Sequence, residues 1–232
     1  TKERFFMWCI IPIKILNQAK HRLRNVLCPE ERQNFFMAMF EDVISTMMSV
    51  PDFEQVAVAT ICPAASIIAK KYGAPVLSTS QDEGQTASVR RSAEILDAKG
   101  ISSMLMIPGD VPLVTVEEIK IVLELHEKAP SMTIVPAYDE LGSNCIALSP
   151  PTAVPLSFGP NSYFPHLETA RKLGLAMQTP KLPGLGLDID TPEDLLKLSR
   201  QTLSTRAQEY LLKKNILERL NNKSKKNLIY KI

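Results

Sequence analysis

The alternation of short apolar runs with amphipathic segments is the feature of this chain that most restricts its fold. An uninterrupted apolar run over residues 5–11 is closed by Pro12, which is typical of a strand buried on both faces. After Pro29, apolar residues recur at helical spacing until Pro51 ends the pattern. This order is repeated along the chain, and it predicts a three-layer α/β fold with a mostly parallel, doubly wound sheet.

The remaining elements follow from the same periodicities and from their Pro and Gly boundaries. We expect strands at residues 56–60, 75–77, 103–107, 132–135 and 145–148, a last strand leading into Asp188, and helices at 63–72, 86–98, 116–128, 163–172 and 191–198. Segment 203–220 is amphipathic and predicts one more helix, packed on the domain or on a second copy in a homodimer. Segment 136–162 is long and irregular, and loops of this kind are usually functional.

Length and charge favour one domain with a basic appendage. A chain of 232 residues with 45% hydrophobic content can form one sizeable core. We therefore predict one main domain over residues 1–200 and a basic C-terminal helix or tail over 201–232. The net charge is +2, but residues 202–232 carry +6, which leaves −4 for the rest. Such a basic end can bind nucleic acid or lipid, although it is more often a solvated helix.

Cysteine and hydropathy patterns favour a cytoplasmic protein. The four cysteines are scattered without a C-x-x-C pair, which is typical of reduced thiols and not of a zinc site or a disulfide framework. No apolar run approaches 18 residues, so no membrane span is expected. The start of the chain also lacks a signal-peptide pattern.

The stretch Ser103–Leu113 contains the strongest signal for a functional site. Its apolar strand ends abruptly at Pro108-Gly109-Asp110, and Pro112 prevents regular structure from continuing. Open α/β sheets bind ligands beyond the carboxyl ends of their strands, which is where Asp110 is expected. Because hard divalent cations prefer oxygen ligands, Asp110 is a candidate metal ligand. The alternative is a structural turn in which Asp110 accepts hydrogen bonds from nearby backbone N–H groups.

A second acidic strand end is predicted at Gly186–Leu195, which contains Asp188 and Asp190. Two strands that each bring a carboxylate to the same sheet edge can bind one metal ion. Alternate residues of a strand face the same side, so periodicity does not separate the two aspartates. Asp190 directly precedes Thr191, which with Pro at the first helical position begins a capping box. Asp190 therefore has a structural alternative, and we prefer Asp188 as the metal ligand.

Basic side chains follow the first predicted strand. Lys14, Lys20, Arg22 and Arg24 suit a polyphosphate, because Arg provides a bidentate fork and Lys a mobile charge. The alternative is a solvated cationic loop. The chain lacks G-x-x-x-x-G-K-[ST], and it lacks G-x-G-x-x-G after the first strand, which excludes a P-loop and argues against a dinucleotide site. Carboxylates and cations together fit nucleotidyl transfer, which requires positioning and neutralisation of charge.

Three small polar turns are further candidates, although each alone is more typical of an ordinary turn. Gly159-Pro-Asn-Ser162 precedes a helix, whose N-terminal N–H groups can bind an anion. Gly142-Ser-Asn144 can close over an acceptor. Glu83-Gly-Gln-Thr86 opens another helix and can contact a base or a ribose, unless Thr86 only caps that helix. We assign no catalytic role to His166, which lies one turn into its helix.

The order of these motifs closely resembles the 2-phospho-L-lactate guanylyltransferase family of coenzyme F420 biosynthesis over residues 5–200. The motifs are Pro12-x-Lys14, Ala19-Lys-x-Arg-Leu23, Pro108-Gly-Asp-Val-Pro-Leu113, Phe158-Gly-Pro-x-Ser162 with His166, and Leu187-Asp-Ile-Asp-Thr-Pro-Glu-Asp-Leu195. Many family members have Gly-Leu-Asn where this chain has Gly84-Gln85-Thr86, and Thr where it has Ser143. The first departure concerns base contacts, while the second keeps the hydroxyl group.

The resemblance implies an α/β/α fold of the nucleotide-diphospho-sugar transferase type and transfer of GMP from GTP to a phosphorylated C3 acid. The implied acceptors are 2-phospho-L-lactate, phosphoenolpyruvate and 3-phospho-D-glycerate. The implied cofactor is Mg²⁺, and a partner transferase would pass the product to the deazaflavin alcohol. The expected residues are Lys14, Lys20, Arg22 and Asp110 for catalysis; Pro12, Lys14, Lys20, Gly84, Thr86, Pro108 and Gly109 for the nucleotide; Ser143, Gly159 and Ser162 for the acceptor; and Asp110, Asp188 and Asp190 for the metal.

Two other functions stay open at this point. A molybdenum-cofactor or sugar-phosphate nucleotidyltransferase is one, although such enzymes usually carry a Gly-x-Gly-x-Arg turn that is absent here. A non-catalytic nucleotide or RNA binder that uses the basic C-terminal helix is the other. That binder would lose its ligand when residues 203–232 are removed and would tolerate Asp110→Asn. We expect the enzyme, with no nucleic-acid or membrane partner.

Overall fold

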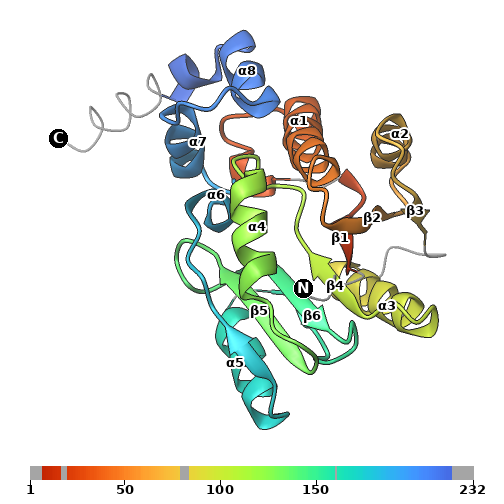
Figure 1. The fold of residues 1–232 in the computed structure, drawn as a ribbon. Helices are drawn as coiled ribbons and strands as arrows, with labels where there is room; N and C mark the ends of the chain where they lie inside the picture. The colour runs from red at the N-terminus through yellow and green to blue at the C-terminus, as the bar shows by residue number, and fades with distance from the viewer. Residues whose placement is uncertain (1–6, 17–19, 79–83, 160, 221–232) are drawn as a thin grey trace.

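The computed structural model describes residues 7–16, 20–78, 84–159 and 161–220 (Figure 1). Its strands are β1 (Met7–Ile13), β2 (Phe53–Thr60), β3 (Val76–Leu77), β4 (Ser103–Met106), β5 (Ser131–Pro136), β6 (Ser143–Ser149) and β7 (Ala176–Gln178). They form one sheet in the order β3-β2-β1-β4-β6-β5-β7. Neighbouring strands are parallel except for β6, which runs antiparallel to β4 and β5. The predicted mostly parallel sheet is confirmed.

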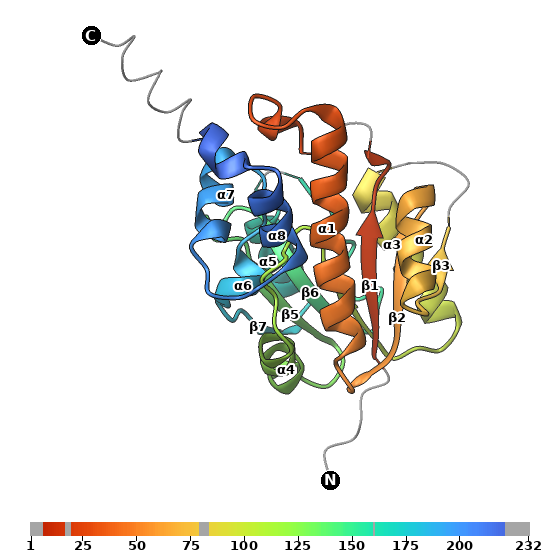
Figure 2. The same cartoon turned by 90° about the horizontal axis from the view of Figure 1, so that it is seen from above.

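Helices cover both faces of the sheet (Figure 2). The helices are α1 (Pro29–Met48), α2 (Pro63–Lys71), α3 (Gly84–Ala98), α4 (Val116–Leu125), α5 (Tyr163–Lys172), α6 (Pro183–Gly186), α7 (Pro192–Ser199) and α8 (Arg206–Lys213). Alternate strand residues point to opposite faces. Cys9 and Ile11 pack on the side of α1, α2 and α4, whereas Ile10 packs on the side of α3 and α5. Two apolar layers therefore hold the central strands in place.

A third apolar cluster joins the C-terminal helices to α1. Phe35 and Met39 of α1 pack with residues of α7 and α8, including Leu198 and Leu211. Asp42 on α1, which is 6% exposed, accepts hydrogen bonds from the backbone N–H groups that begin α8, those of Arg206 and Ala207, both at 2.9 Å. This carboxylate serves as a helix cap supplied from a distant part of the chain.

Two predicted elements differ from the structure. The strand expected before Asp188 is wrong: β7 ends at Gln178, and Pro183–Gly186 forms the short helix α6. Two prolines, Pro180 and Pro183, explain this because proline removes a ladder donor and favours the first position of a helix. The single helix expected over 203–220 is also interrupted, because Asn215 has a positive φ of 50° and α8 ends at Lys213.

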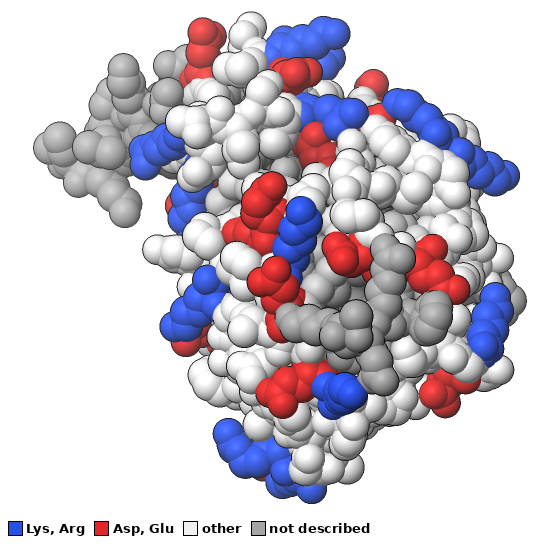
Figure 3. Space-filling model, viewed as in Figure 1, with Lys and Arg blue, Asp and Glu red and all other residues white. Residues whose placement is uncertain are grey.

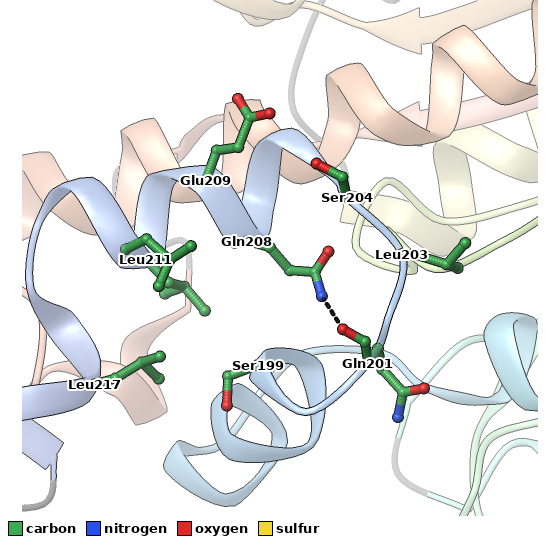
Figure 4. A pocket seen from close by; sticks show the side chains of 9 residues that line it. Ser199, Gln201, Leu203, Ser204, Gln208, Glu209, Leu211 and Leu217 are labelled. Atoms are coloured by element: carbon green, nitrogen blue, oxygen red, sulfur yellow. Dashed lines mark hydrogen bonds between the residues drawn. The ribbon is translucent and has the colours of Figure 1, made fainter.

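The described surface shows mixed charge, and pockets also occur away from the predicted site. Acidic and basic side chains are interspersed over the face in Figure 3, and Arg206 and Arg219 pair with acidic residues of α1. A pocket of about 200 Å³ lies beside α7 and α8, where Gln208 donates to the Gln201 carbonyl (Figure 4). No predicted site residue lines it. Within the described ranges, no helix is long and apolar enough to span a membrane.

Candidate active site

Segments from distant parts of the chain meet at one edge of the sheet. β1 and β4 are adjacent and parallel, so the residues that follow them leave the sheet on the same side. Segment 187–190 lies alongside, because the Ile189 N–H donates to the Asp110 carbonyl oxygen at 3.1 Å. β6 is antiparallel to β4, so its first residues, Ser143 and Asn144, reach this same edge. The topology therefore gathers the metal and acceptor candidates that the sequence predicted separately.

Lys20 forms the centre of the charged part of the site. Its Nζ lies 2.6 Å from Oδ2 of Asp110 and 2.6 Å from Oδ1 of Asp190, and its side chain is 4% exposed. Burial alone would lower the pKa of Lys20, but the charges and hydrogen bonds of the two aspartates outweigh it and raise the pKa above its ordinary value. Arg22 is more peripheral: its side chain is mostly exposed and reaches Asp190 at 4.0 Å. The ammonium group thus joins two carboxylates from distant segments.

Asp188 has different partners from Asp190. Its Oδ1 accepts a hydrogen bond from Nδ2 of Asn144 at 3.1 Å, and the same amide donates to the carbonyls of Leu185 and Gly186. Burial, followed by the negative charge of Asp110, raises the pKa of Asp188 to about 6. In the sequence, Asn144 is seen only as part of a small polar turn. An amide side chain directly before an apolar strand is the signal that the sequence offers, but it does not reveal the antiparallel direction of β6.

A pocket of about 400 Å³ opens beside Lys20. Five of the seven residues predicted to bind the nucleotide line it, together with three other polar residues. The five are Pro12, Lys14, Lys20, Pro108 and Gly109, and the others are Asp110, Asp190 and Gln85. Gly109 lies close to Ile13: a Cβ at this position would lie 2.5 Å from Cδ1 of Ile13, so the end of that side chain would have to move. The volume falls within the range of small-molecule sites. Pocket and carboxylates are therefore contiguous.

The remaining two nucleotide candidates, Gly84 and Thr86, lie at the start of α3 and do not line this pocket. The Thr86 hydroxyl accepts from the Phe158 N–H at 2.9 Å and lies 3.4 Å from the Phe158 carbonyl oxygen as a donor. Thr86 therefore fastens the loop that carries Gly159. The structure places this hydroxyl against the loop that carries Gly159, a predicted acceptor residue, and the nucleotide contact expected for Thr86 stays a prediction.

The three acceptor candidates are only partly gathered. Ser143 and Ser162 are both buried, and the Ser162 hydroxyl donates to Oγ of Ser143 at 3.2 Å. Gly159 is exposed on the loop fastened by Thr86. His166, to which the sequence pattern assigns no role, lies beside the serines with Nδ1 3.0 Å from Oγ of Ser143. The two serines and His166 are therefore joined by hydrogen bonds without a charged side chain among them.

The predicted magnesium ligands lie at one edge, but Lys20 stands between two of them. In the described part of the chain, no group of three or more His, Cys, Asp or Glu side chains is arranged to hold a metal ion. The chemistry of the donors fits a hard cation, because all three predicted ligands are carboxylates. The pKa of Asp188 is raised first by burial and then by the negative charge of Asp110, which lies near it. The magnesium assignment stays a prediction.

Solved structures share this fold. A candidate nucleotide-diphospho-sugar transferase from Desulfovibrio desulfuricans G20 superposes with a TM-score of 0.74 at 15% identity, covering 94% of this chain and 98% of that one. A cytidylyltransferase from Leptospira borgpetersenii superposes with a TM-score of 0.59 at 13% identity, covering 95% and 96%. The predicted fold of the nucleotide-diphospho-sugar transferase type is confirmed. At these identities the two solved structures establish the fold of this chain.

Sequence relatives identify the family. A phosphoenolpyruvate guanylyltransferase from Roseiflexus castenholzii is 32% identical over 90% of this chain and 97% of its own length. A 3-phospho-D-glycerate guanylyltransferase from Colwellia psychrerythraea is 33% identical over 80% and 88%. The family described as guanylyl transferase CofC like matches residues 7–231. The chain belongs to this family and is a nucleotidyltransferase, which confirms the resemblance seen in its motifs.

Proposed function

We propose that this chain transfers GMP from GTP to a phosphorylated C3 acid and releases pyrophosphate. The observation that carries the proposal is the Lys20 bridge between Asp110 and Asp190 beside a pocket at the carboxyl edge of the sheet. The acceptor class is supported by the relatives, which are named for phosphoenolpyruvate and for 3-phospho-D-glycerate. The motifs of the sequence add 2-phospho-L-lactate as a third acceptor. A sugar-phosphate or molybdenum-cofactor acceptor is the alternative.

The proposed reaction is an in-line displacement at phosphorus. A phosphate oxygen of the acid attacks the α-phosphorus of GTP and forms a new P–O bond. The bond from that phosphorus to the α,β-bridging oxygen breaks, and pyrophosphate leaves with the electron pair. Lys14, Lys20 and Arg22 would neutralise negative charge on the phosphates, a contribution that grows in a site shielded from water. Positioning of the two substrates supplies the rest of the acceleration.

We also propose Asp110 and Asp188 as ligands of Mg²⁺, with Asp190 as a third carboxylate. A bound Mg²⁺ would supply Lewis-acid polarisation of the phosphates. Lys20 would then release one of its carboxylates and turn its ammonium group toward the triphosphate. Asn144 would hold Asp188 in place during this exchange through the hydrogen bond at 3.1 Å. As the sequence motifs imply, a partner transferase would use the product together with the deazaflavin alcohol.

Pyrophosphate release tests this proposal. Purified protein is incubated with Mg²⁺ and GTP, and 2-phospho-L-lactate, phosphoenolpyruvate or 3-phospho-D-glycerate is added separately. The partner transferase and the deazaflavin alcohol are present as a trap, because the family's products are labile. We expect release with at least one acid and little release when ATP or CTP replaces GTP. Absence of release with all three acids would overturn the proposed acceptor class.

A further inference from the structure

His166 connects the two buried serines, Ser143 and Ser162, to the loop that contains Ser157 and Phe158. Its Nδ1 lies 3.0 Å from Oγ of Ser143, and its Nε2 accepts a hydrogen bond from the Ser157 backbone N–H at 3.0 Å. The imidazole is 3% exposed and meets the edge of the Phe158 ring, with 5.6 Å between ring centroids. The ring is therefore held on both nitrogens and along its side.

The partner of Nε2 determines where the imidazole proton lies. A backbone N–H can only donate, so Nε2 must present its lone pair to Ser157. Burial lowers the pKa of His166 to about 4, so the ring is neutral near pH 7. A neutral imidazole with an accepting Nε2 carries its proton on Nδ1. Nδ1–H therefore donates to the Ser143 hydroxyl oxygen.

This arrangement leaves the Ser143 hydroxyl available only as a hydrogen-bond donor. Its oxygen accepts from Nδ1–H of His166 and from the Ser162 hydroxyl at 3.2 Å. The two lone pairs are then used, while its own proton has no acceptor among the described residues. Ser143 is 8% exposed and sits next to Asn144, which binds Asp188. A ligand that reaches Ser143 is therefore met by a hydrogen-bond donor.

We propose that His166 is a positioning residue that fixes Ser143 as a donor toward an anionic oxygen of the acceptor. This inference rests on the proposed function, and it adds a residue whose role the sequence pattern does not indicate. His166 does not touch the acceptor. It acts by occupying one lone pair of Ser143 and by holding Ser157 of the neighbouring loop.

Matched variants test the role of His166 in turnover, with phosphoenolpyruvate and 3-phospho-D-glycerate as probes. His166→Leu removes both hydrogen bonds, and we expect the KM for the acid to rise roughly tenfold, with the KM for GTP within about twofold. His166→Asn keeps an N–H donor near the position of Nδ1 and should recover most of the loss. Ser143→Ala should make a second change at residue 166 nearly silent, because the two residues act through one contact.

His126→Leu is the matched control for loss of a buried histidine. His126 is 4% exposed and binds Thr133 and Ser149 in another hydrogen-bonded cluster. We expect this variant to lose stability and to keep the wild-type KM for the acid. An unchanged acid KM in His166→Leu, or an equal rise of both substrate KM values, would overturn the inference. So would additive effects of the changes at residues 143 and 166.

Nitrogen NMR of the full wild-type chain gives a readout that does not need turnover. We expect His166 to show a protonated Nδ1 and an unprotonated Nε2 at neutral pH, and the opposite tautomer would overturn the inference. D-glycerate and glycerol 3-phosphate, added separately, show whether a carboxylate or a phosphate oxygen reaches Ser143 and shifts the His166 signals. Shifts with an acid but no pyrophosphate release would overturn the proposed function and leave His166 as a positioning residue for binding.

Discussion

The two halves of the site use different forces to hold their side chains. On one side, the charged cluster of Lys20, Asp110 and Asp190 is joined by ion pairs of 2.6 Å. On the other, the neutral cluster of Ser143, Ser162 and His166 is joined by hydrogen bonds of 3.0 to 3.2 Å. Asn144 follows Ser143 in sequence, and its amide donates to Asp188, which belongs to neither cluster.

This difference indicates how each half responds to a ligand. Ion pairs are strong but weakly directional, so a metal ion or a triphosphate can replace one partner of Lys20 with another. Hydrogen bonds between neutral groups depend on angle and on proton position, so the serine side offers a fixed pattern of donors. The charged cluster is therefore suited to neutralising phosphates. The neutral cluster is suited to selecting an acceptor by the positions of its hydrogen-bonding atoms.

Asp110→Asn should have the largest effect of any single substitution in the two clusters. It removes one carboxylate from the charged cluster, and we expect kcat to fall by about 10³-fold, comparable to the loss of a main electrostatic group in an active site. Circular dichroism should show an unchanged fold. Asp97→Asn, an exposed change on α3, is the matched control and should leave kcat intact. Near wild-type turnover of Asp110→Asn would remove Asp110 from the catalytic machinery.

Acidification tests the two buried histidines, His166 of the neutral cluster and His126 of a separate one, and we expect the free energy of unfolding to fall by roughly 3 kcal/mol for each as the pH falls from 7 to about 4. Burial lowers the pKa of both to about 4, whereas an unfolded histidine titrates near pH 6.5. Between these values the unfolded chain binds more protons. The stability is therefore complete above about pH 6.5 and is lost as the pH falls toward 4.

Urea unfolding from pH 7 to 5 measures this dependence. His126→Gln should remove about half of the histidine contribution to the slope, and Thr46→Val on α1, which removes no titratable group, should remove none. Asp188 acts in the opposite direction, because its pKa of about 6 makes its contribution decline as the pH rises from about 4 to 6. It is common to all three proteins and cancels in the comparison. Equal slopes in wild type and His126→Gln would contradict the assignment.

Lys20→Met sharpens the comparison by removing only the cation of the charged cluster. We expect kcat to fall roughly 10²-fold, because a group that neutralises phosphate charge is lost. The ligand-free protein should bind Mn²⁺, used as a probe for Mg²⁺, several-fold more tightly, because Asp110 and Asp190 no longer share an ammonium group. Electron paramagnetic resonance measures the free Mn²⁺. Weaker Mn²⁺ binding than in wild type would contradict the proposed exchange, and Lys172→Met, which changes an exposed side chain of α5, is the charge-matched control.

Thr86→Val should have the smallest effect of these substitutions. It tests whether Thr86 supports binding of the acid or binding of GTP. The change removes the contacts with the Phe158 backbone, and we expect the KM for the acid to rise about fivefold, as for loss of one hydrogen bond. The KM for GTP should change less than twofold. Thr46→Val on α1 is the control, because its hydroxyl bonds only within its helix at Asp42. A selective rise of the KM for GTP would assign Thr86 to the nucleotide instead.

Much of the fold is predictable because its signals are local. Two features depend only on residues within one turn or strand, and both appear in the structure. They are the strand that precedes Pro108 and the capping box at Thr191. The strand predicted before Asp188 is wrong because Pro180 and Pro183 outweigh the apolar pattern around them. Since no strand forms there, strand alternation does not place Asp188 and Asp190 on one face, and the structure gives them separate partners.

The candidate site is less predictable where it depends on strand direction. Nothing in the local pattern of residues 143–149 shows that β6 is antiparallel to its neighbours, yet this direction brings Ser143 and Asn144 to the site. His166 has the pattern of an ordinary helical residue for the same reason, since its partners are set by tertiary packing. The sequence therefore predicts which chemical groups are present better than it predicts their contacts.

The cap that Asp42 provides for α8 has a consequence for synthesis of the chain. Asp42 and Arg206 are separated by 164 positions, which a ribosome covers in roughly 10–30 s at ordinary elongation rates. During that interval α1 has already been made, but the helices that cover Phe35 and Met39 have not. The nascent protein therefore exposes an apolar helix face and an unsatisfied acidic side chain until its last helices emerge, which makes this surface a natural substrate for chaperones.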